Sequence, residues 1–106
     1  MDKRIKQLIN QVKEHLIEMY GRKIKKVILY GSFVRDDSTR DSDIDILVLV
    51  DQSLKPFEVR ENLSDLLFDI LLEEGELISV IVVPEHLCEN YNSPFMLNVR
   101  KEGLVA

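Results

Sequence analysis

The stretch that decides the fold is VILYGSFVRDDSTRDSDIDILVLV, residues 27–50, in which two apolar runs enclose a polar segment. The runs, residues 27–30 and 44–50, are short and, apart from Asp45, rich in β-branched and aliphatic side chains, which predicts two strands. The second run is unbroken over residues 46–50, which indicates a central strand buried on both faces. The polar segment, residues 31–42, predicts a loop that opens with a helical turn.

Amphipathic patterns on either side of this stretch predict helices. Apolar residues recur every three or four positions over residues 5–20, and Gly21 is suited to end that helix because a residue just past a helix often has a positive φ. A second helix is expected to begin at Pro56 and to close near Gly75. Its inner face is expected to carry Val59, Leu63, Leu66, Leu67, Ile70 and Leu71.

The remainder of the chain adds one strand and a last helix. Residues 77–83 are apolar apart from Ser79 and predict a third strand, after which a short helical segment is expected. Ser93 followed by Pro94 predicts the N-cap and first position of a helix over residues 94–102. Helices and strands in this order predict an α/β fold in which helices cover a small mixed β-sheet.

Length and composition limit the classes of protein to consider. With 106 residues, 45% hydrophobic and 31% charged, the chain is expected to form one domain over residues 1–106. The single cysteine, Cys88, cannot form an intramolecular disulfide, and no zinc-ligand spacing is present. A net charge of −5 argues against nucleic acid as a partner and favours a basic protein. No apolar run approaches the roughly 20 residues that span a bilayer, so no membrane association and a cytoplasmic location are expected.

Two features of the decisive stretch carry chemistry. Gly31 and Ser32 follow directly on a strand, where backbone N–H groups, a hydroxyl and the lack of a side chain at Gly31 favour phosphate binding. Asp43 and Asp45 are two residues apart at the start of a strand, so both carboxylates lie on one face and together favour a divalent cation. A phosphate-binding turn beside a site for a divalent cation is typical of nucleotidyl or phosphoryl transfer.

Two further polar residues in this stretch are candidates for nucleotide binding. Arg35 lies one helical turn after Gly31 and Ser32 and is suited to pair with phosphate oxygens. A local salt bridge to Asp41 or Asp43 is the alternative. Ser42 is suited to cap or orient the acid pair, although ordinary loop chemistry explains it as well.

Gly31-Ser32 followed by Asp43-Ile44-Asp45 resembles the GS…DxD signature of the polymerase-β-like nucleotidyltransferase superfamily. At this length the chain is similar to the minimal nucleotidyltransferases (MNT), whose members often act as antitoxins beside a HEPN-type toxin. The resemblance extends from Lys26 to Val83, and more weakly over residues 93–95 and 98–103.

This resemblance implies a fold like the polymerase-β palm and a Mg²⁺-dependent nucleotidyltransferase. It implies that Gly31 and Ser32 hold the triphosphate of ATP, that Asp43 and Asp45 bind Mg²⁺, and that a nucleoside monophosphate passes to an acceptor. In the antitoxin branch the acceptor is a hydroxyl of the partner toxin, which adenylylation blocks. No motif encodes the preferred base, and the sequence leaves a homo-oligomer possible.

One position departs from the family pattern. The family has a third carboxylate near the start of the next strand, and Ser79 stands at that place here. The nearest acid, Glu76, lies three residues earlier, on the opposite face of a regular strand, from which a bulge or a loop would have to bring it to the metal. Glu76 is therefore the candidate third catalytic residue. Because the third acid serves as base or second-metal ligand in the family, its loss would slow or stop transfer while nucleotide still binds.

The sequence thus supports an enzyme and a binding module as alternatives. The enzyme is a nucleotidyltransferase that adenylylates a protein partner, in keeping with a chain too short for a separate substrate domain. The binding module is a catalytically impaired antitoxin that neutralises a basic toxin by direct contact, in keeping with Ser79 and the charge of −5. A transferase acting on a small molecule such as an aminoglycoside is less well supported, because nothing beyond the core remains to hold a sugar.

Overall fold

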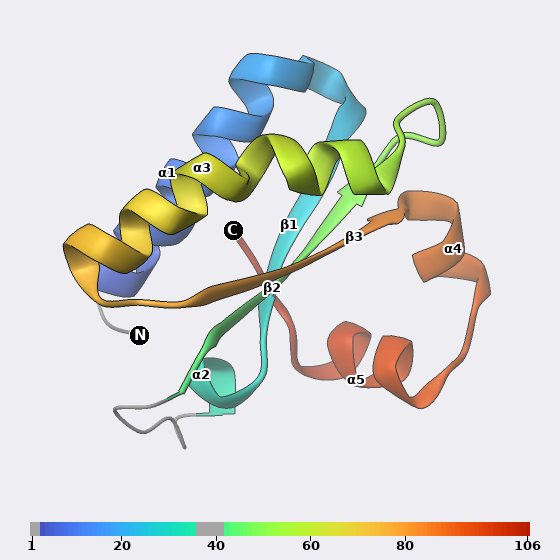
Figure 1. Cartoon of the computed structure of the whole chain (residues 1–106). Helices are drawn as coiled ribbons and strands as arrows, with labels where there is room; N and C mark the ends of the chain where they lie inside the picture. Colours follow the sequence, from blue (N-terminus) through green and yellow to red (C-terminus); the bar gives the residue numbers. More distant parts are fainter. Residues whose placement is uncertain (1–2, 36–41) are drawn as a thin grey trace.

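The computed structural model describes residues 3–35 and 42–106, and Figure 1 shows the arrangement of their helices and strands. The elements in chain order are α1 (Lys3–Tyr20), the 3-10 turn η1 (Gly21–Lys23), β1 (Ile24–Tyr30), α2 (Ser32–Arg35), β2 (Ile44–Val50), α3 (Pro56–Glu74), β3 (Ile78–Pro84), α4 (Glu85–Asn90), α5 (Pro94–Glu102) and β4 (Leu104–Val105). The polar loop predicted between the first two strands lies outside the described residues over 36–41.

The strands of the described chain form one mixed sheet in the order β3-β2-β1-β4. Strand β2 is antiparallel to β1 and parallel to β3, and β4 runs antiparallel to β1. A parallel pair needs a crossover connection, which α3 supplies between β2 and β3. The α/β class, the mixed sheet and the central position of β2 are confirmed.

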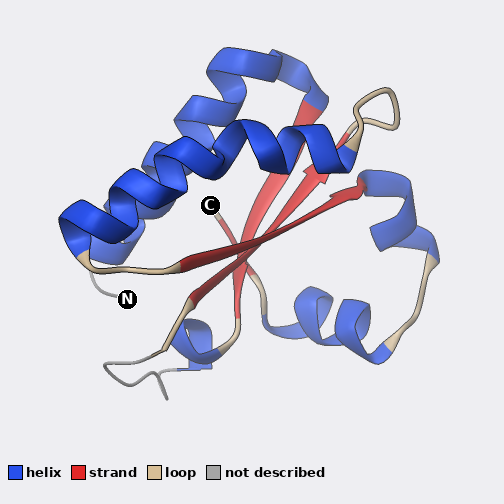
Figure 2. Ribbon diagram, viewed as in Figure 1, coloured by secondary structure: helices blue, strands red, loops and turns tan. Residues whose placement is uncertain are grey.

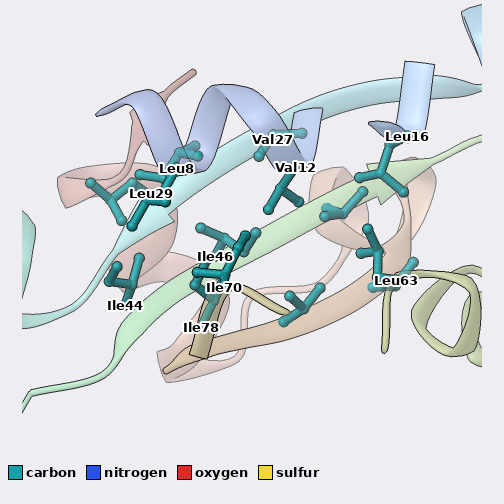
Figure 3. Packing of buried hydrophobic residues seen from close by; sticks show 14 of the residues in the cluster. Leu8, Val12, Leu16, Val27, Leu29, Ile44, Ile46, Leu63, Ile70 and Ile78 are labelled. Atoms are coloured by element: carbon teal, nitrogen blue, oxygen red, sulfur yellow. The ribbon is translucent and has the colours of Figure 1, made fainter. Parts of the chain in front are cut away.

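Helices cover both faces of this sheet (Figure 2). Alternate residues of β2, namely Ile44, Ile46 and Val48, pack beneath α1 and α3 in the larger core cluster. Figure 3 shows this packing, in which Leu8 and Val12 of α1 meet the sheet from the same side as α3. The intervening β2 residues and the opposite face form a second cluster: Ile28, Leu47, Leu49, Cys88 and Val99. Burial on both faces explains why β2 is apolar without interruption from Ile46 to Val50.

Local signals explain where two helices begin or end. Gly75 closes α3 with a φ of 69° in the left-handed region, and its N–H donates to the carbonyl oxygen of Leu71. The Ser93 hydroxyl accepts a hydrogen bond from the Met96 amide at 3.2 Å and so caps α5, which Pro94 opens. Within the described residues, no helix has both the length and the apolar character needed to cross a membrane.

The structure corrects some sequence predictions at element edges. Leu71 was predicted on the inner face of α3 but is 37% exposed, because the buried stripe of this helix is narrow and follows Val59, Leu63 and Ile70. Strand β1 begins at Ile24, earlier than predicted, since the exposed Lys25 and Lys26 conceal the apolar pattern. The two-residue strand β4 was not predicted, because its pairing with β1 leaves no periodicity in so short a segment.

Candidate functional site

Gly31 forms the turn between β1 and α2. Its φ of 87° lies in the left-handed region, which residues with a Cβ rarely adopt. The amides of Val34 and Arg35 donate to the Gly31 carbonyl oxygen at 3.1 and 3.3 Å, and these bonds define the turn. A Cβ on Gly31 would stand 2.5 Å from a carboxylate oxygen of Asp45. The turn therefore brings bare backbone against the Asp45 carboxylate, which a side chain at Gly31 would prevent.

The two acids lie where the chain enters β2. Ile44 between them is fully buried, so period-two alternation directs Asp43 and Asp45 to the opposite face of the sheet. Asp43 is exposed and Asp45 is half-buried. Burial raises the pKa of Asp45, the Asp43 carboxylate raises it further, and Arg35 lowers it. The fold thus holds two like charges near each other, an arrangement that a cation would relieve.

A row of three residues crosses the sheet at this point. Tyr30 of β1 is the register partner of Asp45, and Asp45 is the register partner of Ser79 on β3. Register partners on neighbouring strands lie on the same face of the sheet, so Ser79 lies beside Asp45. Burial, followed by the charge of Asp45, raises the pKa of Tyr30. The structure therefore places a hydroxyl next to Asp45, where the family resemblance implies a carboxylate.

The described residues contain no group of three His, Cys, Asp or Glu side chains that could hold a metal ion. Asp43 and Asp45 therefore form a pair of hard oxygen donors without a third acid. Such a pair suits Mg²⁺, which usually binds through one or two carboxylates together with water and substrate phosphates.

Glu76 has a different partner. Its carboxylate forms an ion pair with Arg4 near the start of α1. The same guanidinium donates to the carbonyl oxygen of Glu74 at 3.3 Å, so the contact joins α1 to the end of α3. Because α1 and α3 cover the opposite face of the sheet from Asp45, this contact supports a structural role for Glu76. Its catalytic role stays a prediction.

We expect Glu76→Gln to weaken folding slightly and to leave nucleotidyl transfer unchanged. The loss in the free energy of unfolding should be below about 1 kcal/mol, because the Arg4 side chain is 49% exposed and solvent screens the ion pair. Urea unfolding of Glu76→Gln, Arg4→Gln and the double variant would measure the coupling between the two residues. A loss of transfer without a loss of stability would instead assign Glu76 as the third catalytic acid.

Arg35 and Ser42 lie on either side of the undescribed segment. Arg35 Nη1 is 3.7 Å from Glu102 Oε2 of α5, and its charge lowers the pKa of Asp45, so the guanidinium lies close enough to influence the acid pair. The alternative salt bridge of Arg35 to Asp41 lies outside the described residues. Ser42 is half-buried and directly precedes Asp43. The binding of nucleotide by Arg35 and Ser42 stays a prediction.

The structure contains a cavity next to Gly31 that the sequence did not predict. It has a volume of about 190 Å³ and is lined by Tyr30, Gly31, Arg35, Phe95, Asn98, Val99 and Glu102. Phe95 of α5 packs on Tyr30 in an edge-to-face arrangement, with ring centroids 5.3 Å apart. The α5 residues are remote from Gly31 in sequence, and no local pattern signals that α5 packs beside this turn.

Asp45→Asn is expected to stabilise the fold at neutral pH when divalent cations are removed with EDTA. The pKa of Asp45 is raised in the folded chain, so folding favours its protonated form. That contribution to stability is complete below the unfolded-state pKa of 3.8 and is lost as pH rises through the raised pKa. Asparagine is uncharged throughout, so its advantage should be present at neutral pH and vanish below pH 3.8.

Thermal unfolding of Asp45→Asn and of the unsubstituted chain, at neutral pH and below pH 3.8, measures this difference in stability. We expect the midpoint of Asp45→Asn to rise by about 2 °C at neutral pH, a small value because solvent screens the half-exposed pair. A lower midpoint at neutral pH would contradict the raised pKa of Asp45, which burial and then the Asp43 carboxylate cause.

Fold and site together define the class of this protein: it is a small α/β domain with the nucleotidyltransferase fold. Its sequence matches the nucleotidyltransferase domain family over residues 9–102, and the chain belongs to that family.

Individual relatives cover different shares of the chain. MJ0604 of Methanocaldococcus jannaschii, named provisionally as a protein adenylyltransferase, is 38% identical over 105 residues, which span 98% of this chain and 95% of that protein. MJ0128 of the same organism carries the same provisional name and is 42% identical over 66 residues, spanning 59% of this chain and 65% of its own length.

Solved structures share the fold at lower identity. A toxin–antitoxin structure with AMP-PNP matches with a TM-score of 0.58 and 18% identity, over 90% of this chain and 69% of that one. A mutant of the toxin–antitoxin MntA–HpeT matches with a TM-score of 0.59 and 20% identity, over 92% of this chain and 69% of that one. The presence of AMP-PNP belongs to the first of these structures, and at this identity both matches establish the fold alone.

Proposed function

We propose that this chain is a Mg²⁺-dependent adenylyltransferase and acts as an antitoxin by transferring AMP from ATP to a hydroxyl of a partner toxin of the HEPN type. The observation that carries the proposal is the contact of the bare Gly31 backbone with Asp45, on the face that also carries Asp43. It sets the Gly31 turn, where the sequence predicts phosphate binding, directly beside the two carboxylates. The provisional names of the relatives support protein adenylylation, and the toxin–antitoxin neighbours support a toxin as acceptor.

The reaction forms one P–O bond and breaks another. The acceptor oxygen attacks the α-phosphorus of ATP, the bond from that phosphorus to the oxygen bridging to the β-phosphate breaks, and pyrophosphate leaves. In this proposal the triphosphate lies at the Gly31 turn, where the Ser32 hydroxyl and the Arg35 guanidinium bind its oxygens. The proton of the acceptor hydroxyl must pass to a base, and the Ser79 hydroxyl is unsuited to that role at neutral pH.

Asp43 and Asp45 would hold the Mg²⁺ ion. Their two carboxylates supply hard oxygen ligands, and the raised pKa of Asp45, caused by burial and by Asp43, indicates the repulsion that a divalent cation would offset. When bound, Mg²⁺ neutralises the charge that develops on the transferring phosphoryl group.

A labelling experiment tests the proposal. Lysate of the native host is incubated with ATP labelled at the α-phosphate, Mg²⁺ and the purified chain, and proteins are separated by mass. The expected result is a labelled protein band that requires the added chain and disappears with EDTA. Absence of a labelled protein, with ATP binding intact, would reject the transferase in favour of the binding module.

Ser79→Asp is expected to increase the rate of transfer by at least about tenfold. The substitution supplies a carboxylate beside Asp45 at the register position where the family has one, and a positioned general base contributes about a hundredfold or more. The rate of label incorporation measures the effect. The control is Ser79→Asn, because asparagine has the shape of aspartate without its charge. If both variants transfer at the same rate, a missing third carboxylate does not limit this chain.

A second candidate function is neutralisation of the toxin by direct binding, with transfer slow or absent. The observation that favours it is Ser79 beside Asp45, where a third acid is expected. Co-expression of the toxin with the Asp43→Asn/Asp45→Asn variant separates the two functions. Protection that persists in this variant supports direct binding, whereas binding without protection supports adenylylation.

A further inference from the structure

The cavity beside Gly31 lies on one definite side of the acid pair. In the row across the sheet, Tyr30 and Ser79 stand on opposite sides of Asp45. The cavity includes Tyr30 and extends to α5, so it lies on the side of Asp45 away from Ser79. A nucleotide whose phosphates lie at Gly31 can therefore extend into the cavity and leave the Ser79 side open to an acceptor.

The size of the cavity suits one ring system of a ligand. Pockets that enclose a complete small ligand usually have volumes of about 300–1,000 Å³. The cavity, at about 190 Å³, is smaller than that, and Gly31 and Arg35 form part of its lining. A ligand that occupies it would keep its charged part outside, at the turn.

The α5 wall carries the two groups that recognition of a base needs. Phe95 is 37% exposed while its ring is held by the edge-to-face contact with Tyr30, so aromatic surface remains open to a ligand. Asn98 follows three residues later, which places it on the same face of the helix. Its side-chain amide carries both donors and an acceptor, the combination that forms paired hydrogen bonds with the edge of adenine.

Glu102 continues this face of α5 by one more turn. Its carboxylate lies 3.7 Å from the guanidinium of Arg35, and both residues line the cavity together with Gly31. The Arg35 guanidinium therefore lies beside the cavity and the Gly31 turn, where it can bind the phosphates of a nucleotide whose base is in the cavity.

We propose that the cavity between Gly31 and α5 binds the adenine of the nucleotide, with Phe95 as the stacking surface and Asn98 as the residue that reads the edge of the base. This inference rests on the proposed function, since it assigns the base subsite of the same nucleotide. It makes α5 the element that selects ATP among nucleoside triphosphates.

The test measures binding of ATP, GTP, CTP, UTP and inorganic tripolyphosphate by calorimetry in the presence of Mg²⁺. We expect Phe95→Leu, which keeps apolar bulk without the aromatic ring, to weaken ATP binding by about tenfold and to leave tripolyphosphate binding unchanged. Asn98→Ala is expected to remove the preference for ATP over the other three triphosphates. Leu97→Ala is the matched control, because Leu97 is 49% exposed on the same helix and does not line the cavity.

The outcomes separate this inference from the function on which it rests. If the unsubstituted chain binds neither ATP nor tripolyphosphate, both the proposed function and the base subsite are rejected. If ATP binds no tighter than tripolyphosphate, or if neither the Phe95 nor the Asn98 variant differs from the Leu97 control, the base subsite alone is rejected. Circular dichroism of each variant confirms that the fold is retained.

Discussion

The variant Asp43→Asn/Asp45→Asn is expected to lose nucleotidyl transfer, with the rate reduced by about a thousandfold or more, equivalent to roughly 4 kcal/mol in the activation barrier. The substitution keeps the size of both side chains but removes both charges that would hold Mg²⁺. Without the cation, the negative charge on the transferring phosphoryl group is no longer neutralised. Incorporation of α-phosphate label into the acceptor protein measures the rate.

The matched control for this variant is Asp65→Asn/Asp69→Asn on α3. It changes the net charge of the chain by the same amount, at two exposed positions of a helix that covers the opposite face of the sheet. The control should transfer as fast as the unsubstituted chain. Equal activity of the two double variants would show that Asp43 and Asp45 take no part in the reaction.

Gly31→Ala is expected to reduce both stability and transfer. The new Cβ would stand 2.5 Å from a carboxylate oxygen of Asp45, and the φ of 87° adds backbone strain of about 1–2 kcal/mol for a residue with a side chain. Relief of the clash requires Asp45 to move, and displacement of the carboxylate that is proposed to bind Mg²⁺ is expected to lower transfer by about a hundredfold. Chemical unfolding and the labelling assay measure the two effects.

Gly75→Ala separates backbone strain from the clash. Gly75 has a comparable φ of 69°, but a Cβ there would meet no atom within 4 Å. This control should lose stability from strain alone and keep full transfer. A Gly31→Ala variant that behaves like Gly75→Ala in both assays would refute the close approach of Asp45 to the turn.

Prediction from the sequence succeeded where the signal is local. The start of α3 at Pro56 and its end before Gly75 depend on backbone preferences of single residues, and the cap of α5 depends on the side-chain hydroxyl of Ser93; the structure confirms all three. Strand β2 was predicted at its observed bounds, because its residues from Ile46 to Val50 are buried in turn under one helix layer and the other.

Prediction was less complete where a residue depends on a remote partner. Glu76 is predicted as a third acid because it is the acid nearest to Ser79 in sequence, and this role stays a prediction. The sequence did not indicate that its carboxylate pairs with Arg4, which lies 72 residues away along the chain. The cavity beside Gly31 likewise depends on how α5 packs against β1, and neither segment alone predicts that packing.

The sequence by itself determined the class of fold, the strand–turn–helix around Gly31 and the pair Asp43 and Asp45, because periodicity, turn chemistry and a two-residue spacing all act over a few residues. The register that sets Ser79 beside Asp45, the contact of Asp45 with Gly31 and the aromatic wall of α5 were decided by the tertiary structure. These features join strands and helices that are distant in the chain, so they arise only when the sheet assembles and its two faces are covered.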